Sequence, residues 1–269
     1  MSVTSVSNSL SASLSSPLVT RLRAAGCVFA EDEAELLLST ARTPDELDAM
    51  ARRRCAGEPL ELVLGWAGFR GLRITVTPGV FVPRRRTEFL ADRAAALARP
   101  GSVVVDLCCG SGAVATALAA TVTGLDLHAA DIEPPAVRCA RLNLGDAGRV
   151  HEGDLYAALP DTLRGRVDVL VANTPYVPTS EIPLLPPEAR DHEPLVTLDG
   201  GADGLDVQRR VAAGARSWLA PGGSLLVETS ERQAVRTMAV FAGAGLVPRL
   251  ARDEELDAHV VIGVRPGRR

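Results

Sequence analysis

Short apolar segments alternate with helix-forming segments through the second half of this 269-residue chain, and this alternation limits the possible folds more than any other feature. We expect strands at residues 103–107, 125–130, 150–153, 167–172 and 224–228, and a closing strand pair at 246–251 and 259–264. Strands that alternate with helices form a parallel sheet with helices on both faces. The sequence therefore predicts a doubly wound α/β domain.

A smaller helical domain is expected in front of it. Thr43-Pro44-Asp45-Glu46 has the pattern of a capping box with proline at the first helical position, and Ser16, Pro17 and Gly26 mark the start and stop of an earlier helix. A third helix is expected at residues 31–38. Apolar alternation at residues 69–82 around Pro78-Gly79 predicts a β-hairpin. We predict a disordered tail (1–16), a helical substrate-docking domain (17–68), a hairpin linker (69–88) and the α/β domain (89–269).

Composition narrows the class of protein. Hydrophobic residues make up 46% and charged residues 23% of the chain, which is typical of a soluble globular protein. The net charge of −4 disfavours nucleic acid as a partner. The Ser-rich start lacks the features of a secretory signal, and no apolar stretch is long enough to cross a membrane, so we expect a cytoplasmic protein, with a transit peptide as the second interpretation. All 29 basic residues are Arg, which indicates a GC-rich, bacterial genome.

Five cysteines, odd in number and without metal-ligand spacing, predict neither a disulfide framework nor a zinc site, and no metal is expected. The four histidines are scattered and are expected to be structural.

A ligand-binding turn is expected where the first strand of the α/β domain ends. Asp106-Leu107-Cys108-Cys109-Gly110-Ser111-Gly112 joins that strand to an apolar helix, and glycines at such a junction let the backbone approach a ligand. Asp131 ends the next strand about 20 residues later, where a carboxylate can accept both ribose hydroxyls. This pattern favours S-adenosylmethionine; a generic turn and a nicotinamide dinucleotide site are the alternatives, and the third glycine of a dinucleotide cradle is missing.

Asp154 and Leu155 follow the third strand, where the carboxylate can meet an adenine amino group while the leucine packs on the ring; a surface turn is the alternative. The complete set of predicted cofactor-binding residues is Asp106, Cys108, Cys109, Gly110, Ser111, Gly112, Asp131, Ile132, Asp154, Leu155 and Asn173.

A catalytic motif is expected at the end of the fourth strand, in Asn173-Thr174-Pro175-Tyr176. The Asn173 side-chain oxygen and the Thr174 carbonyl can accept both N–H groups of an amide or amino nitrogen, while Tyr176 packs against its plane. Such acceptors orient the nitrogen lone pair and stabilise the positive charge that develops during methyl transfer. An ordinary strand-end turn is the alternative interpretation.

These residues resemble a known family. Asn173 to Tyr176 is similar to the Asn-Pro-Pro-Tyr motif of amino methyltransferases, and the chain from about Pro59 to Arg265 resembles the protein-(glutamine-N5) methyltransferases of the HemK or PrmC type. Further shared segments are Gly65 to Phe69, Phe81-Val82-Pro83-Arg84, Thr87-Glu88, Glu193-Pro194, Asp199 to Asp206 and Pro221-Gly222-Gly223.

The resemblance implies a seven-stranded, Rossmann-like class I methyltransferase sheet behind a helical substrate-docking domain, S-adenosylmethionine as cofactor, and a peptide chain release factor as protein substrate. It also implies that Gly110, Gly112, Asp131, Leu155 and Asn173 hold the cofactor and that Asn173, Thr174, Pro175 and Tyr176 hold the glutamine amide of a Gly-Gly-Gln loop. We add Pro83 and Arg84 to the expected substrate-binding residues, and we expect a monomer without membrane contact.

Three departures from the family pattern stand out. Cys108 replaces the first glycine of the loop, which is tolerable with a negative φ. Thr174 replaces the first proline of the motif, which makes the turn less rigid. Arg85-Arg86 replaces the usual Pro-Glu, which changes charge and stiffness near the expected active-site mouth.

Several interpretations stay open at this point. The run Arg84 to Arg86 can guide an acidic partner or form a solvated face, and Asp203 and Asp206 are expected to shape the substrate side. Two functional alternatives to glutamine methylation are methylation of an adenine amino group in nucleic acid and a cofactor-binding protein with little catalysis.

Overall fold

The computed structural model describes residues 16–267, which form two compact units. Unit 1 contains the described residues up to Trp66 together with Pro186–His192, and unit 2 contains Ala67–Leu185 and the described residues from Glu193 onward. The predicted tail falls almost entirely on residues 1–15, outside the described residues. No helix among residues 16–267 is long and apolar enough to cross a membrane.

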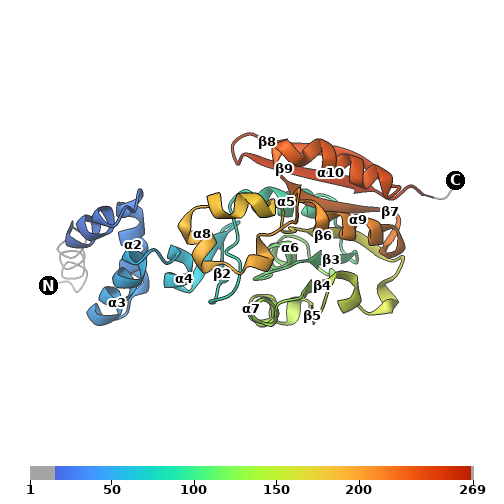
Figure 1. Ribbon diagram of the computed structural model, residues 1–269. Coiled ribbons are helices and arrows are strands. Elements are labelled where there is room, and N and C mark those ends of the chain that lie inside the picture. Colours follow the sequence, from blue (N-terminus) through green and yellow to red (C-terminus); the bar gives the residue numbers. More distant parts are fainter. Residues whose placement is uncertain (1–15, 268–269) are drawn as a thin grey trace. The chain divides into compact units, whose positions relative to one another are not determined.

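Unit 2 is built on a seven-stranded sheet with the order β5-β4-β3-β6-β7-β9-β8 (Figure 1). The five strands from β5 to β7 are parallel, and β9 pairs antiparallel with both β7 and β8. The strands are β3 (Val103–Leu107), β4 (Asp126–Asp131), β5 (Arg149–Glu152), β6 (Val167–Ala172), β7 (Leu219–Thr229), β8 (Val247–Asp253) and β9 (Ala258–Val264). The predicted fold class, including the seven strands and the closing antiparallel pair, is confirmed.

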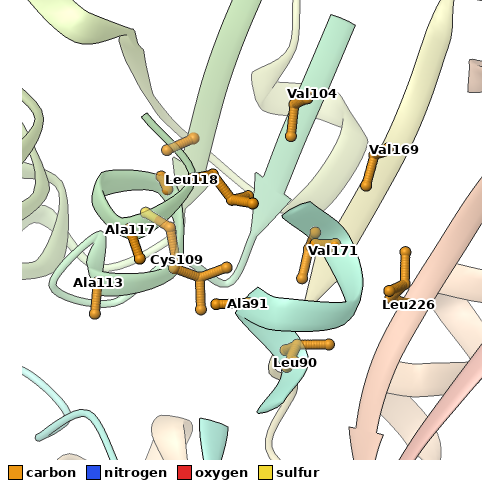
Figure 2. Packing of buried hydrophobic residues seen from close by; sticks show 14 of the residues in the cluster. Leu90, Ala91, Val104, Cys109, Ala113, Ala117, Leu118, Val169, Val171 and Leu226 are labelled. Atoms are coloured by element: carbon orange, nitrogen blue, oxygen red, sulfur yellow. The ribbon is translucent and has the colours of Figure 1, made fainter. Parts of the chain in front are cut away.

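Helices cover both faces of this sheet, because alternate residues of the buried strands face opposite sides. The helices of unit 2 are α5 (Thr87–Ala95), α6 (Ala113–Thr121), α7 (Pro134–Leu144), α9 (Asp206–Trp218) and α10 (Glu231–Gly243). On one face, Val104, Val169 and Val171 pack with α5, α6 and α7 (Figure 2). On the other face, the intervening strand residues pack with α9 and α10, where Trp218 and Phe241 are fully buried.

Unit 1 contains a helix at residues 16–24, α2 (Ala30–Thr40), α3 (Pro44–Cys55), α4 (Leu60–Leu64) and α8 (Pro187–His192). The capping box of α3 forms as expected on one side, because the Thr43 hydroxyl accepts the Glu46 N–H at 3.1 Å. The returning bond differs, since the Glu46 carboxylate accepts from the Arg42 N–H rather than from Thr43. Neither α4 nor the contribution of α8 to this unit was predicted from the sequence.

The hairpin lies earlier in the chain than predicted. Its strands are β1 (Trp66–Phe69) and β2 (Leu72–Thr75), joined at Arg70-Gly71, where both residues have positive φ values of 49° and 74°. Two successive positive φ values give the turn whose twist matches paired strands. Pro78-Gly79 instead forms a turn closed by the Val80 N–H to Thr77 carbonyl bond, and residues 76–86 contain no strand. The proline-then-glycine order suits a type II turn, which splays strands apart.

Candidate active site

The predicted site residues share one edge of the sheet. β4, β3 and β6 are neighbours and run parallel, so their carboxyl ends lie side by side. Cys108–Gly112 follows β3, Asp131 ends β4, and Asn173 follows β6. The chain continues from β3 to β4 in one direction of the sheet, whereas β6 lies on the other side of β3. Such a reversal of strand order is where open α/β sheets bind ligands.

The loop after β3 is held to β4 by two backbone bonds. The Cys109 N–H donates to the Ala130 carbonyl at 3.1 Å, and the Gly110 N–H donates to the Asp131 carboxylate at 2.8 Å. Gly112 has φ 75°, and a Cβ there would lie 3.0 Å from the Ala140 Cβ, so this glycine permits close packing between α6 and α7.

Cys108 departs from what the sequence predicts. Its φ is 54°, in the left-handed region, where a non-glycine residue is strained by about 1 kcal/mol. The condition under which cysteine would replace glycine freely, a negative φ, is therefore not met. Cys109 and Ser111 of the same loop are buried, and Cys109 belongs to the hydrophobic core beneath α6.

Two carboxylates lie at this edge, the buried Asp106 and the half-buried Asp131. Asp106 is fully enclosed and accepts the Ala115 N–H at 3.1 Å, and burial raises its pKa to about 7. Burial also raises the pKa of Asp131, opposed by hydrogen bonds from the Glu133 and Gly110 N–H groups. Both carboxylates are thus costly to ionise without a cation or additional donors nearby.

The remaining residues of the predicted cofactor set are more open. Ile132, directly after Asp131, is 50% exposed, which leaves it available to a planar ring. Leu155 has a positive φ of 49°. Asp154 pairs with Arg210 at 2.5 Å, a partner that no sequence pattern indicates. A half-buried carboxylate, a tight glycine turn and an exposed isoleucine are groups that fit a nucleoside.

At the end of β6, the Asn173 amide has a defined orientation. Its Nδ2 donates to the Thr87 hydroxyl at 3.3 Å, which leaves Oδ1 as the free acceptor. Thr87 is itself buried, and its hydroxyl helps to keep down the pKa of the Glu228 carboxylate at the end of β7, which burial raises. The next residue, Thr174, is 2% exposed, and its hydroxyl has no hydrogen-bond partner among residues 16–267. The corner thus presents an amide oxygen and a main-chain turn to an incoming N–H group.

Comparison of the sequence with known proteins shows the family of this chain. A release factor glutamine methyltransferase of Geobacter sulfurreducens is 36% identical over 230 residues, which cover 83% of this chain and 80% of that protein. A second, from Streptomyces coelicolor, is 42% identical over 70% of this chain and 69% of its own length. The chain belongs to the release factor glutamine methyltransferase family. The family resemblance and the prediction of a methyltransferase are confirmed.

Other comparisons agree on the fold, and one of the relatives is named for a different methyl acceptor. The methyltransferase small domain model matches residues 71–183. A methyltransferase from Pyrococcus furiosus superposes with a TM-score of 0.56 over 73% of this chain and 90% of its own, at 16% identity. A 4-amino-L-phenylalanine/4-methylamino-L-phenylalanine methyltransferase of Streptomyces pristinaespiralis is 37% identical over 84% of this chain and 80% of its own length.

The arginine run, one of this chain's departures from the family pattern, is neither a solvated face nor a free basic patch. Arg84 binds both oxygens of the buried Glu193 at 2.6 and 2.7 Å and lies over the Phe81 ring. Arg86 contacts Tyr176 and the buried Glu228. Of the three, only Arg85 is exposed without a partner among the described residues. Arg84, predicted to bind substrate, is therefore engaged in fixing its own segment.

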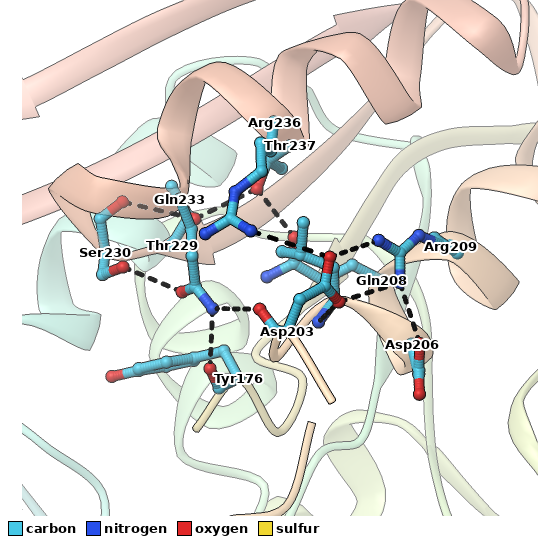
Figure 3. Close-up of polar contacts among 11 residues, drawn as sticks. Tyr176, Asp203, Asp206, Gln208, Arg209, Thr229, Ser230, Gln233, Arg236 and Thr237 are labelled. Atoms are coloured by element: carbon cyan, nitrogen blue, oxygen red, sulfur yellow. Dashed lines mark hydrogen bonds and ion pairs between the residues drawn. The ribbon is translucent and has the colours of Figure 1, made fainter. Parts of the chain in front are cut away.

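Tyr176 is held at both ends. Its hydroxyl lies 2.6 Å from Arg86 Nη2 and 3.4 Å from Glu228 Oε1. Its carbonyl accepts the Gln233 side-chain N–H at 2.9 Å (Figure 3). Burial raises the pKa of the Tyr176 phenol to about 12, so its hydroxyl stays protonated and can donate to Glu228. Neither Arg86 nor Gln233 was predicted from the sequence to contact Tyr176.

The glycine-rich loop from Asp199 to Asp206 closes on the same tyrosine. Gln233 also donates to the Asp203 carbonyl at 3.2 Å, and the Asp203 carboxylate pairs with Arg209 (Figure 3). Gly204 has φ 76°, and a Cβ on it would lie 2.2 Å from the main-chain carbonyl oxygen of Tyr176. These contacts place the loop beside Tyr176 of the Asn-Thr-Pro-Tyr motif, and a role of Asp203 and Asp206 on the substrate side stays a prediction.

The histidines are less scattered than the sequence suggests. His128 on β4 and His151 on β5 stack with ring centroids 5.2 Å apart and share a hydrogen bond at 2.9 Å. Burial lowers the pKa of both rings. No group of three or more metal-ligating side chains occurs in the described part of the chain.

Proposed function

We propose that this protein transfers a methyl group from S-adenosylmethionine to the side-chain nitrogen of a glutamine in a peptide chain release factor. The observation that carries the proposal is the orientation of Asn173, whose Nδ2 is used by Thr87 so that its oxygen is left to accept an N–H group. A carboxamide NH₂ has two such hydrogens, and the Thr174 carbonyl supplies the second acceptor. Membership of the release factor glutamine methyltransferase family supports the choice of substrate.

The residues at the ends of β3 and β4 are proposed to hold the cofactor. Gly110 and Gly112 allow close approach of the backbone, Asp131 accepts the ribose hydroxyls, and Ile132 contacts the adenine ring. When bound, the cofactor supplies an electrophilic methyl carbon on a positively charged sulfur. Asp154 can reach the adenine amino group if its exposed ion pair with Arg210 opens, and such a pair is worth about 1 kcal/mol or less.

The chain's own residues account for the orientation of the acceptor. An amide nitrogen is a poor nucleophile because its lone pair is delocalised into the carbonyl group. Two acceptors that bind its hydrogens draw the lone pair out of conjugation and stabilise the positive charge on nitrogen as the new bond forms. The Tyr176 ring, fixed by Arg86 and Gln233, limits rotation of the bound group. Once the nitrogen is methylated, its proton is acidic and leaves to water without a dedicated base.

The helical unit is proposed to dock the protein substrate. Val28 and Phe29 are adjacent in sequence, and their exposed fractions are 83% and 68%. These two adjacent side chains offer exposed apolar area that a bound protein would cover.

A small aromatic amine is the second candidate acceptor. A relative of similar identity is a 4-amino-L-phenylalanine/4-methylamino-L-phenylalanine methyltransferase, and an aniline nitrogen also has two N–H groups and a delocalised lone pair. The same Asn173 and Thr174 acceptors suit either nitrogen.

Mass spectrometry after incubation with labelled S-adenosylmethionine distinguishes these acceptors. Release factors, a Gly-Gly-Gln peptide, 4-aminophenylalanine and ribosomal RNA are offered separately. Label on glutamine supports the proposal; label on an aromatic amine, on adenine or on nothing rejects it. Asn173→Ala should abolish transfer while cofactor binding is retained, whereas Asp131→Ala should weaken cofactor binding first. Equal loss of binding in both variants would contradict the separate roles given to the two residues.

A further inference from the structure

Two departures from the family pattern, Arg86 and Thr174, act on the same catalytic turn. Arg86 Nη2 donates to the Tyr176 hydroxyl at 2.6 Å, and Arg86 Nε donates to Glu228 Oε1 at 3.3 Å. The Tyr176 hydroxyl lies 3.4 Å from the same Glu228 oxygen. The three side chains therefore form a closed triangle of hydrogen bonds. The Glu228 carboxylate is almost completely buried, whereas 48% of the Arg86 side chain is exposed.

Thr174 weakens the turn that this triangle adjoins. Proline at this position would fix φ and reduce the flexibility of the turn, and threonine does not. Threonine at this position makes no hydrogen bond that proline would lack, because neither its hydroxyl nor its backbone N–H has a hydrogen-bond partner among residues 16–267. Substituting proline there would remove no bond that the described residues make.

We propose that Arg86 is a positioning residue that holds Tyr176 against the acceptor and replaces the rigidity lost when threonine stands in the place of proline at position 174. The inference rests on the proposed transfer to an amide or amino nitrogen at this corner.

The charge of Arg86 is suited to this task. An acidic side chain at position 86 would face the buried Glu228 carboxylate, and an ionised carboxylate has no N–H or O–H to donate to Glu228 or to the tyrosine oxygen. A guanidinium has several donors in one plane, so it reaches both oxygens at once. Arg86 also neutralises a carboxylate whose pKa is raised by burial, which keeps Glu228 available as an acceptor.

A double-mutant cycle tests the proposal. Arg86→Met keeps the side-chain length and removes the donors, so kcat for the acceptor should fall about tenfold while the cofactor Kd stays within about twofold. Thr174→Pro keeps the main-chain carbonyl at this position and is the second single variant of the cycle, with which the double variant is compared. The double variant should recover most of the lost kcat, because proline restores the restraint. Arg85→Met, on the exposed neighbour, is the matched control and should not change kcat.

Additive effects in the cycle, or full activity of Arg86→Met, would overturn the proposal. Arg86→Lys provides a second variant if Arg86→Met folds poorly. It keeps the charge and loses the planar pair of donors, and it should therefore lower kcat as well.

A spectroscopic measurement separates this inference from the proposed function. The chain has two tyrosines, Tyr156 and Tyr176, so fluorotyrosine labelling gives two ¹⁹F resonances, and Tyr156→Phe assigns them. The Tyr176 resonance should shift and broaden in Arg86→Met and sharpen again when Thr174→Pro is added. An unchanged Tyr176 resonance refutes the role of Arg86 even in an active enzyme. Failure of the wild type to methylate glutamine refutes the proposed substrate. The Tyr176 resonance still tests the role of Arg86 in that case, because it does not depend on the substrate.

Discussion

Gln233 provides the most direct test of how hydrogen bonds to the main chain hold the catalytic turn in place. Its side chain is 4% exposed, its amide nitrogen donates to the Tyr176 and Asp203 carbonyls at 2.9 and 3.2 Å, and its oxygen accepts from Ser230 at 2.8 Å. Gln233→Met has nearly the same volume and makes none of these bonds. At about 1 kcal/mol for each bond, the free energy of unfolding should fall by about 3 kcal/mol.

The activity of the same variant should fall through kcat. Tyr176 would lose the bond that fixes its backbone and keep those that fix its hydroxyl, so the acceptor would still bind but would be held less precisely. Urea unfolding and steady-state methyl transfer measure the two effects, with the 77% exposed Val235 changed to Thr as a control on the same helix. A loss of stability near 3 kcal/mol without any loss of kcat would refute the link between Gln233 and the catalytic turn.

Three further predictions follow from single features. Gly204→Ala should reduce methyl transfer severely, because its Cβ would lie 2.2 Å from the main-chain carbonyl oxygen of Tyr176. Gly222→Ala is the control: Gly222 has φ 83° and no atom near the position of a Cβ, so this variant should lose only about 1 kcal/mol of stability. The pKa values of His128 and His151 are lowered in the folded protein, so these rings take up protons on unfolding. Stability should therefore fall as the pH drops below about 6.5, and it should fall less in His151→Gln. Urea titrations at several pH values measure both effects. Phe29→Ser should raise KM for an intact release factor and not for a Gly-Gly-Gln peptide; equal KM changes would reject the docking role.

Much of the α/β unit could be predicted because its strands are buried on both faces. The predicted strands at 103–107 and 167–172 match β3 and β6 at both ends, since a continuous apolar run has a clear beginning and end. β7 is longer than predicted, Leu219–Thr229 rather than 224–228, because it includes Pro221, Gly222 and Gly223, which the sequence analysis did not assign to a strand.

Contacts between distant segments account for what could not be predicted. The alternating residues after Phe69 suggested a hairpin around Pro78, but conformational preference at Arg70-Gly71 decided the turn. No sequence pattern pairs Arg86 with Glu228, 142 positions away, or Gln233 with the Tyr176 carbonyl. The residues whose chemistry is local to a strand end, Asp131 and Asn173, were identified because parallel strands bring their carboxyl ends to one edge.

The exclusive use of arginine, first interpreted as a consequence of genome composition, also has structural consequences. Arg54 is buried, binds both oxygens of Glu33, and pairs with Glu188 through its third nitrogen. Arg84 contacts both oxygens of Glu193, and Arg86 bonds a carboxylate and a phenol together. A lysine ammonium is a compact charge that lacks the planar fork needed to bind a carboxylate in this way. Arg84 uses a single nitrogen, but Arg54 and Arg86 each use two or more nitrogens of one guanidinium, so genome composition alone does not explain the choice of residue at these two positions.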